Sequence, residues 1–380
     1  MKFFDDFLCQ KHKKNHAVCG DFAACERTAE GMIYVVCDGI GSGIYANISA
    51  ITCSSRILEL YRKSMSIRLT CEMVAASMNR ARTEDIPFSA FSAAVILPDG
   101  RFTAYVYEMP NPILMENGHA TVLVPRFYKA GLEEIGEVYG TLNLGDCLLM
   151  FSDGVSQAGL GHGYGMGIGS EGVFDFINLN YGTDDNIAEL PQRIVEMCKT
   201  VSEGSRSDDT TLALIHCREA KQLTLLTGPP SKRSMDHSYA LDFMNMPGQK
   251  IICGSTTAGL IAGELNLELE TSSVGDSFGM PPEYRVEGID LVTEGVITLN
   301  QVCNILDEPL ERLTESSAAE RLCRWLHSAD VIYLMIGNAV NAAHEDLIFK
   351  QVGVHVRRTA IRKIAEKLKD IGKLVIERNY

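Results

Sequence analysis

The most informative stretch of this sequence is Val36-Cys37-Asp38-Gly39-Ile40-Gly41-Ser42-Gly43, which follows an apolar run that begins at Gly31. The run has the length and the β-branched composition of a buried strand. An Asp-Gly pair directly after it is typical of a turn. Apolar residues then recur with helical spacing over 46–63. The stretch therefore predicts a strand that ends at an acidic residue and is followed by a helix.

Three other acidic residues stand at the ends of expected strands. Asp153 follows the apolar segment 146–151, Asp208 comes before the strand expected at 210–216, and Asp21 precedes a short link to the first strand. Any one of them is explained by a turn. Carboxylates that converge at one edge of a sheet would repel each other unless a cation lay between them. Mg²⁺ or Mn²⁺ is the natural occupant, because both are hard cations that prefer oxygen ligands.

Other elements follow from periodicity and turn signals. The segments 88–97 and 102–108 flank Pro98-Asp99-Gly100 and predict a hairpin. A helix is expected over 71–82 with Thr70 as its N-cap. An amphipathic helix is expected over 186–201, interrupted early by Pro191.

The pattern changes near residue 219, where we place a domain boundary. Beyond it, short apolar strands alternate with glycine turns and helices, as in 250–253, 254–265, 331–336 and 357–369. The fold class is therefore α/β (α+β), with an N-terminal domain over 1–218 and a smaller α/β domain over 219–380. The second domain is interpreted as regulatory or ligand-binding.

Composition excludes several classes of protein. The chain has 380 residues and a net charge of −14, which argues against a nucleic-acid binder. Its 12 cysteines form no C-x-x-C pair and no cluster with zinc-ligand spacing. The sequence contains no apolar window of transmembrane length, and we expect no signal peptide. We expect a reduced, cytoplasmic protein with no membrane partner.

The ordered acidic motifs resemble the metal-dependent serine/threonine phosphatases of the PP2C type, and more narrowly the branch typified by the sporulation phosphatase SpoIIE. The resemblance covers about residues 5–218. It is carried by Asp38-Gly39-Ile40-Gly41-Ser42-Gly43 with Ala46 and Ser49, by Gly145-Asp146 and Ser152-Asp153-Gly154-Val155, and by Asp208-Asp209-x-Thr211. It implies an αββα sandwich with two Mn²⁺ or Mg²⁺ ions at one end. It also implies hydrolysis of phosphoserine or phosphothreonine by a water activated between the two cations, without a phosphoenzyme.

The resemblance also implies roles for individual residues. Asp38 would bridge both metals, and the Gly39 carbonyl would ligate one of them. Asp153 and Asp208 would complete the other metal's shell, and these three acids form the expected catalytic set. Asp21 would hold a metal-bound water or act just outside the ligands. Asp209 occupies the position beside Asp208, and we favour Asp208 as the ligand.

The sequence departs from the wider family at several positions. Ile40 stands where many members have a His proposed as general acid, although the SpoIIE-like branch also tends to have an apolar residue there. The Asp that binds a third metal in many bacterial members has no match near 107–115. The phosphate-binding Arg of some members is not evident before Asp21, where Lys14 and His16 are the nearest cationic residues and are expected at the surface.

Three further segments are candidate sites. The glycine-rich stretch 159–167 lacks the Gly-Lys-Ser/Thr ending of a phosphate loop and is interpreted as a flap with an exposed His162. Ser255, Thr256 and Thr257 begin a helix after a strand and could bind an anion, but a simple helix cap explains them as well. The basic residues of the last helix, Arg357 and Arg358 among them, are interpreted as a solvated face.

The leading hypothesis is a metal-dependent phosphoserine/phosphothreonine phosphatase. Its substrate would be a phosphorylated protein, and the resemblance suggests an anti-anti-sigma-like or another bacterial signalling protein. The alternative is a degenerate phosphatase fold that acts as a signalling or interaction module, with the C-terminal domain as a ligand sensor.

Overall fold

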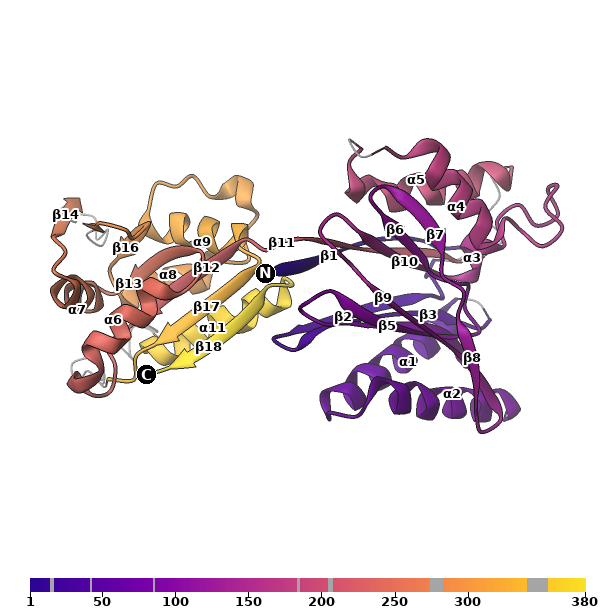
Figure 1. Ribbon diagram of the computed structural model, residues 1–380, viewed down its shortest axis with the longest axis horizontal. Helices are drawn as coiled ribbons and strands as arrows, with labels where there is room; N and C mark the ends of the chain where they lie inside the picture. Colours follow the sequence, from indigo (N-terminus) through magenta and orange to yellow (C-terminus); the bar gives the residue numbers. More distant parts are fainter. Residues whose placement is uncertain are drawn as a thin grey trace. The chain divides into compact units, whose positions relative to one another are not determined.

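The computed structural model describes residues 1–13, 17–41, 43–84, 86–182, 185–203, 208–273, 283–339 and 355–380. The chain divides into two compact units, Met1–Glu219 and Ala220–Tyr380. Figure 1 shows the first in indigo to magenta and the second in orange to yellow. No helix in these described ranges is both long and apolar enough to cross a membrane.

The first unit contains two antiparallel sheets. One has the strand order β1-β11-β10-β6-β7 and the other the order β2-β3-β4-β5-β9-β8. The first sheet comprises β1 (Lys2–Lys11), β11 (Thr210–Glu219), β10 (Cys147–Phe151), β6 (Ile113–Glu116) and β7 (His119–Val122). The second comprises β2 (Phe22–Thr28), β3 (Gly31–Gly39), β4 (Ser89–Ile96), β5 (Arg101–Tyr107), β9 (Glu133–Thr141) and β8 (Arg126–Ala130).

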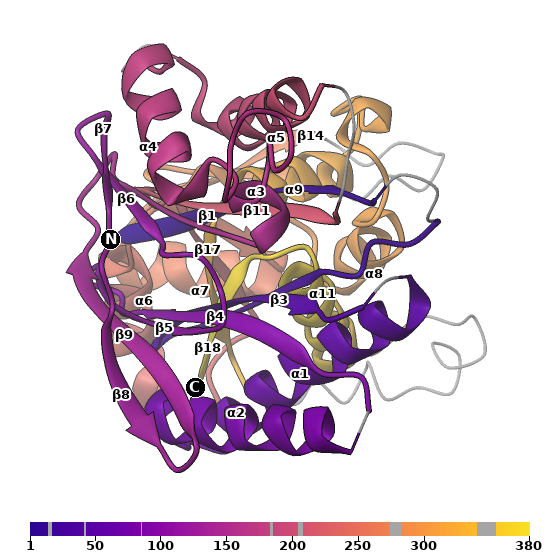
Figure 2. The ribbon, with the colours of Figure 1, turned by 90° about the vertical axis from the view of Figure 1, so that its right-hand side faces the viewer.

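Helices cover the outer face of each sheet, as Figures 1 and 2 show. Helices α1 (Ile44–Arg62) and α2 (Ile67–Thr83) pack on the second sheet through one buried cluster, which includes Ile57 and Val74. Helices α4 (Gly169–Asn180) and α5 (Leu190–Val201) pack on the first sheet through another. A third cluster fills the space between the sheets. Central strands such as β10 and β4 are buried almost throughout, because a helix layer covers one face and the other sheet covers the opposite face. The result is an αββα sandwich, the fold that the family resemblance implies.

Most local expectations for this unit are confirmed, with two differences. The hairpin around Pro98-Asp99-Gly100 is β4–β5. Thr70 is not an N-cap, because α2 begins one turn earlier and Ser66 accepts a hydrogen bond from the Leu69 amide. Pro191 does not interrupt a helix but lies in the first turn of α5, where its missing N–H costs nothing, and a short 3-10 turn (Ile187–Glu189) precedes it.

The second unit has a single sheet of order β14-β15-β16-β13-β12-β17-β18. The strands β16 (Leu291–Thr293), β13 (Gln249–Cys253), β12 (Gln222–Thr227), β17 (Val331–Ile336) and β18 (Leu374–Asn379) are parallel. The strands β14 (Leu269–Ser273) and β15 (Glu283–Val286) extend it antiparallel. The sequence did not indicate β18, whose exposed half carries Glu377, Arg378 and Asn379.

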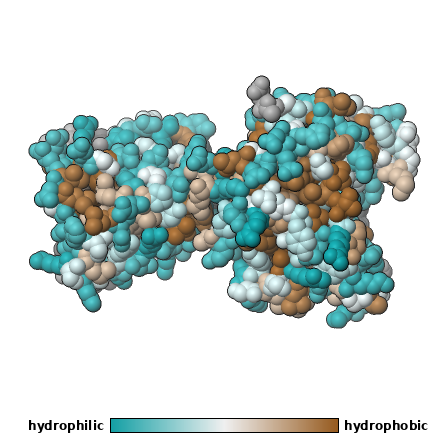
Figure 3. All heavy atoms as spheres, viewed as in Figure 1, coloured by the Kyte–Doolittle hydropathy of each residue, from teal (hydrophilic) through white to brown (hydrophobic). Residues whose placement is uncertain are grey.

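Helices lie on both faces of this sheet. Helices α6 (Asp236–Asn245) and α7 (Ser255–Leu265) bury one face, and α8 (Val296–Ile305), α9 (Ala318–Ser328) and α11 (Arg357–Asp370) bury the other. Along β12, Leu225 faces one layer and Leu226 the opposite layer, which explains why parallel strands read as continuous apolar runs. Apolar atoms also reach the surface among hydrophilic ones, as Figure 3 shows.

Candidate metal centre

Asp21 and Asp38 lie side by side at one end of the second sheet. Strands β2 and β3 are antiparallel, with Phe22 opposite Cys37. The residue before Phe22 is therefore placed opposite the residue after Cys37. The pairing of β2 with β3 thus brings two acids from different segments together.

Asp153 and Asp208 come together at the end of the first sheet. Phe151 of β10 is opposite Leu212 of β11. Beyond this pair the Ser152 amide donates to the Thr211 carbonyl at 3.0 Å, and the Thr211 amide donates to the Ser152 hydroxyl at 3.0 Å. The end of β10 and the start of β11 are therefore tied together where the acids stand.

Two glycines allow the backbone to approach closely at this end of the sandwich. A Cβ on Gly39 would lie 2.0 Å from the Ala46 carbonyl oxygen, so only glycine lets α1 pack against the end of β3. A Cβ on Gly154 would lie 1.9 Å from the Asp209 carbonyl oxygen. Each glycine follows an acid of the set, and this proximity explains why Asp-Gly recurs there.

Burial and mutual repulsion perturb these acids strongly. Burial, followed by the charges of Asp21 and Asp153, raises the pKa of Asp38 to about 9. Burial also raises the pKa of Asp21 to about 6, against the opposing effect of the Thr211 and Ser152 hydroxyls. The pKa of Asp153 is raised by burial as well, and its carboxyl is close enough to Asp38 to share a hydrogen bond. Three carboxyl groups thus lie close together, and the ionisation of one disfavours the ionisation of the others.

Asp21 is the clearest sign that something is needed to balance this charge. Its side chain is 2% exposed, and neither carboxylate oxygen has a hydrogen-bond partner of normal geometry. Burying an unpartnered carboxylate is costly, so the group requires either a proton or a cation. The chemistry of the set, oxygen donors with excess negative charge, fits Mg²⁺ or Mn²⁺.

The side chains are not arranged as a preformed cage. Within the described residues, no group of three or more His, Cys, Asp or Glu side chains is placed to hold a metal ion. Asp208 instead has Lys13 as its neighbour, with Nζ 3.8 Å from Oδ1. Asp153 accepts a hydrogen bond from the Gln157 amide at 2.7 Å. Repulsion between carboxylates and these alternative partners account for the open arrangement.

Asp209 differs from the other acids. Its two oxygens accept the backbone amides of Lys13 at 2.7 Å and Gly20 at 2.9 Å, and the residue is 5% exposed. Asp209 therefore holds the segment that leads to Asp21. This role favours Asp208 as the ligand of the pair.

Sequence reasoning missed the partners of these acids. Lys13 and Gln157 belong to no recognisable motif. Only the fold brings Lys13 close to Asp208 and Gln157 close to Asp153. Ser152 and Thr211 stood inside the quoted motifs without an assigned role. Lys14, His16 and Ser42 lie outside the described residues.

The remaining sequence candidates in this unit lie apart from the acids or lack their chemistry. Ile40 is 42% exposed and offers no proton. His162 of the glycine-rich stretch has Nδ1 3.2 Å from Glu203 Oε2, which supplies it with a local partner. In the 107–115 segment, Glu108 pairs with Arg82.

In the second unit, Ser255, Thr256 and Thr257 lie at the start of α7. They line a pocket with a volume of about 470 Å³, which also includes Arg357 and Arg358. The two arginines were interpreted as solvated, but Arg357 is half-buried, because its side chain reaches the carbonyl groups after β17.

Comparison with known proteins identifies the first unit. A family model for stage II sporulation protein E (SpoIIE) matches residues 28–218, half of the chain. No curated protein sequence is significantly similar to the chain.

Solved structures share the fold at low sequence identity. The PP2C phosphatase domain and a fragment of the regulatory domain of SpoIIE from Bacillus subtilis is 16% identical, with a TM-score of 0.50, and the match covers 57% of this chain and 64% of that one. The SpoIIE phosphatase domain from Bacillus subtilis in a crystal form without domain swapping is 15% identical, with a TM-score of 0.46 over 57% and 93% of the two chains. The SiaA-PP2C domain of Pseudomonas aeruginosa is 16% identical, with a TM-score of 0.46 over 56% and 85%. The structural match to the first of these, at a TM-score of 0.50, shows a common fold.

Proposed function

The chain belongs to the SpoIIE family, and we propose that it is a metal-dependent phosphoserine/phosphothreonine protein phosphatase. The observation that carries this proposal is the cluster of acids at one end of the sandwich, where Asp21 is buried and Asp38 and Asp153 are half-buried. Burial and repulsion there raise the pKa values of all three. Strongly perturbed carboxyl groups that converge are typical of a functional site.

Each residue of the cluster has a distinct part in this proposal. Asp38, Asp153 and Asp208, together with the Gly39 carbonyl, would hold two divalent cations. When bound, the cations supply the positive charge and Lewis acidity that phosphoryl transfer to water requires. Asp21 would hold a cation-bound water or act just outside the ligands. Gln157 orients the Asp153 carboxylate through its hydrogen bond.

The chain supplies little for protonating the leaving group. Ile40 has no titratable group, so the proton comes from water or from another donor. Lys13 brings a positive charge within 3.8 Å of Asp208. Such a cation attracts a phosphate dianion toward the acidic cluster.

The surface beside the cluster suits a protein substrate. Ile44, Tyr45 and Ile48 in the first turns of α1 are 64%, 75% and 54% exposed. Helix α1 begins directly after the Asp38 turn, so these side chains border the acids. Exposed apolar groups at such a place are typical of a protein-binding surface. An anti-anti-sigma-like or another bacterial signalling phosphoprotein is the partner that the family suggests.

The central experiment measures hydrolysis of p-nitrophenyl phosphate and of a phosphoserine peptide with and without Mn²⁺. The Asp38→Asn variant should lose the metal-dependent activity while keeping its fold by circular dichroism. Asp175→Asn serves as the matched control, because Asp175 is an exposed acid on α4. Activity that survives in the Asp38 variant, or that never requires a divalent cation, would refute the proposal.

A second candidate function is a degenerate phosphatase fold that acts as a signalling module. The open arrangement of the acids and the apolar Ile40 favour it. Calorimetric titration with MnCl₂ separates the two, because a module would show no metal binding up to about millimolar concentrations.

We also propose a reducing, cytoplasmic location. None of the twelve cysteines, all of which lie in the described ranges, is in a disulfide, and nine of them are buried as small apolar groups.

A further inference from the structure

The parallel strands of the second unit create a crevice between two neighbouring loops. Strand β12 lies between β13 and β17 in the sheet. The chain leaves β12 through α6, on one face, toward β13, and it leaves β17 through α11, on the opposite face, toward β18. Connections therefore leave the sheet in opposite directions at β12 and β17. In open α/β sheets, ligands bind outside the carboxyl ends of the strands at such a point.

The pocket of about 470 Å³ lies at this crevice. Its walls include residues that follow four strands: Gly228 and Pro229 after β12, Gly254 after β13, Glu294 after β16, and Ala339 after β17. Gly228 has a φ of +77°, and a Cβ there would lie 1.4 Å from an Arg357 guanidinium nitrogen. Glycine at this position therefore makes room for the arginine side chain.

One wall presents unused hydrogen-bond donors. Helix α7 begins at Ser255 without a side-chain cap, so the amide groups of its first turn have no intrahelical acceptor. Thr257 is 1% exposed and lines the pocket, yet its hydroxyl has no hydrogen-bond partner within the described residues. A hydroxyl that lines a pocket and has no partner in the protein is available to a ligand atom.

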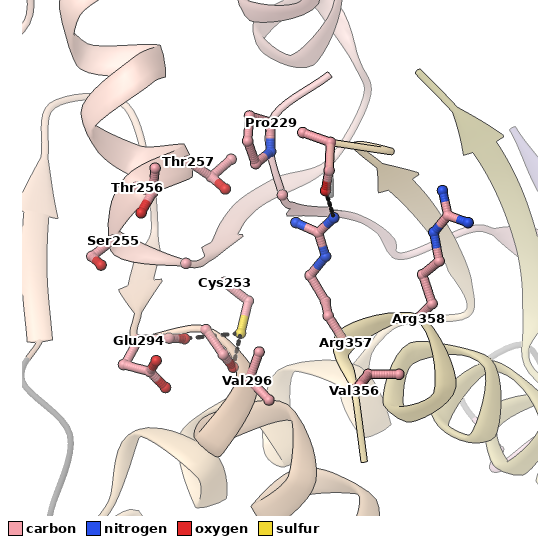
Figure 4. Close-up of a pocket in the computed structure, with 14 residues that line it drawn as sticks. Pro229, Cys253, Ser255, Thr256, Thr257, Glu294, Val296, Val356, Arg357 and Arg358 are labelled. Atoms are coloured by element: carbon pink, nitrogen blue, oxygen red, sulfur yellow. Dashed lines mark hydrogen bonds between the residues drawn. The ribbon is translucent and has the colours of Figure 1, made fainter. Parts of the chain in front are cut away.

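The opposite wall presents positive charge. Arg357 is half-buried, and burial lowers the pKa of its guanidinium. It donates to the carbonyl oxygens of Gly337 at 2.6 Å and Ala339 at 3.2 Å, but it forms no ion pair with an acid among the described residues. Figure 4 shows Arg357 across the pocket from Thr257. A half-buried cation that is not paired with an acid favours an anion beside it.

The acid in the pocket lining, Glu294, does not neutralise this arginine. Its carboxylate accepts the amides of Ile297 at 3.1 Å and Thr298 at 3.5 Å, at the first turn of α8. Its charge is thus used to cap that helix. Arg358 adds a second positive charge at the rim, where it donates to the Asn338 side chain at 2.9 Å.

We propose that this pocket binds a small organic molecule through its phosphate group. The phosphate accepts hydrogen bonds from the amides at the start of α7 and from Thr257, and Arg357 supplies the counter-charge. The volume exceeds the space that a bare phosphate fills and lies in the range of small-molecule sites, so an organic body occupies the remainder. Nucleotides and sugar phosphates share this chemistry.

Calorimetric titrations of the full chain test the proposal. The protein carries Asp38→Asn and is kept in EDTA, so that phosphate does not bind at the acidic cluster of the first unit. The probes are inorganic phosphate, AMP and glucose 6-phosphate, with adenosine and glucose as their unphosphorylated counterparts. At least one organic phosphate should bind with one site per chain, about tenfold or more tighter than its counterpart.

Two variants and two matched controls locate the site. Thr257→Val removes the hydroxyl with little change of shape and should weaken binding about fivefold. Thr298→Val is its control, because that buried hydroxyl also lacks a partner but does not line the pocket. Arg357→Gln should weaken binding about tenfold or more, whereas Arg362→Gln on the same helix should not, since Arg362 pairs with Glu366 at the surface.

Three results would overturn the proposal. The first is the absence of binding for every phosphate probe up to about 10 mM. The second is equal affinity for phosphorylated and unphosphorylated probes. The third is unchanged binding in a folded Thr257→Val variant. Because Arg357 also supports the loop after β17, Arg357→Lys and a thermal unfolding curve show whether a loss of binding reflects charge or misfolding.

Discussion

Replacing Asp38 by Asn should stabilise the protein when no metal is present. Burial and neighbouring acids raise the pKa of Asp38 from its ordinary 3.8 to about 9. Because the pKa of Asp38 is higher in the folded state, the stabilisation that comes from binding its proton is complete below pH 3.8. This stabilisation is lost as the pH rises toward 9. At pH 7 the folded protein must therefore hold a proton that the unfolded chain releases.

The pKa values set the size of the effect. Keeping a carboxyl of pKa 3.8 protonated at pH 7 requires about 4 kcal/mol, because each pH unit is worth about 1.4 kcal/mol. Asn has nearly the same shape and needs no proton. We expect Asp38→Asn to raise the free energy of unfolding of the metal-free protein by about 1–4 kcal/mol at pH 7. Each kcal/mol corresponds to about 2–4 °C in Tm for a unit of this size.

Scanning calorimetry of the full chain in EDTA at several pH values measures the effect. The advantage of the variant should grow as the pH rises from 5 to 8, and added Mn²⁺ should stabilise the wild type far more than the variant. The single tryptophan, Trp325, packs against the core of the second unit, so its fluorescence reports that unit separately.

Asp175→Asn again serves as the control, with no expected pH-dependent gain. The reasoning is refuted if Asp38→Asn is less stable than the wild type in EDTA at pH 8, or if Mn²⁺ stabilises both proteins equally.

Further predictions concern the surroundings of the cluster. Tyr45→Ser should lower kcat/KM for a phosphoprotein but not for p-nitrophenyl phosphate. The control Leu132→Ser, at a 94% exposed site in the β8–β9 turn, should change kcat/KM for neither substrate. Equal losses on both substrates in the Tyr45 variant would contradict docking on α1. Gly39→Ala should destabilise the first unit by about 1–3 kcal/mol or more in urea unfolding, because its Cβ would overlap the Ala46 carbonyl. Asp209→Asn should lower the free energy of unfolding by about 2–4 kcal/mol, because it weakens the hydrogen bonds that Asp209 accepts from backbone amides. Asp208→Asn should change the free energy of unfolding by less than about 1 kcal/mol and should instead weaken Mn²⁺ binding. The reverse pattern in unfolding and titration would exchange the roles of the two acids.

Local sequence signals predicted many elements of the fold. Strand β17 has the expected bounds, and β10 and β13 lie within a residue of theirs, because apolar runs ended by Gly or Asp are determined by nearby residues. The helix start at Thr70 was misplaced, since Ser66 is an equally good cap and the apolar face of α2 extends to it. Strand β18 was missed because its polar end gives little apolar signal and its position depends on pairing with β17.

The sequence by itself determined the order of the elements and the placement of four acids at strand ends, because turns and periodicity are encoded by adjacent residues. Only the tertiary structure decided which polar groups meet. Asp209 accepts hydrogen bonds from the backbone amides of Lys13 and Gly20, nearly two hundred residues away in the chain, whereas its neighbour Asp208 does not. Arg357 belongs to a helix that reads as a solvated face, yet it reaches a pocket opposite Thr257. Such partners are determined by the long-range packing of sheets and helices, and neighbouring residues in the sequence do not indicate them.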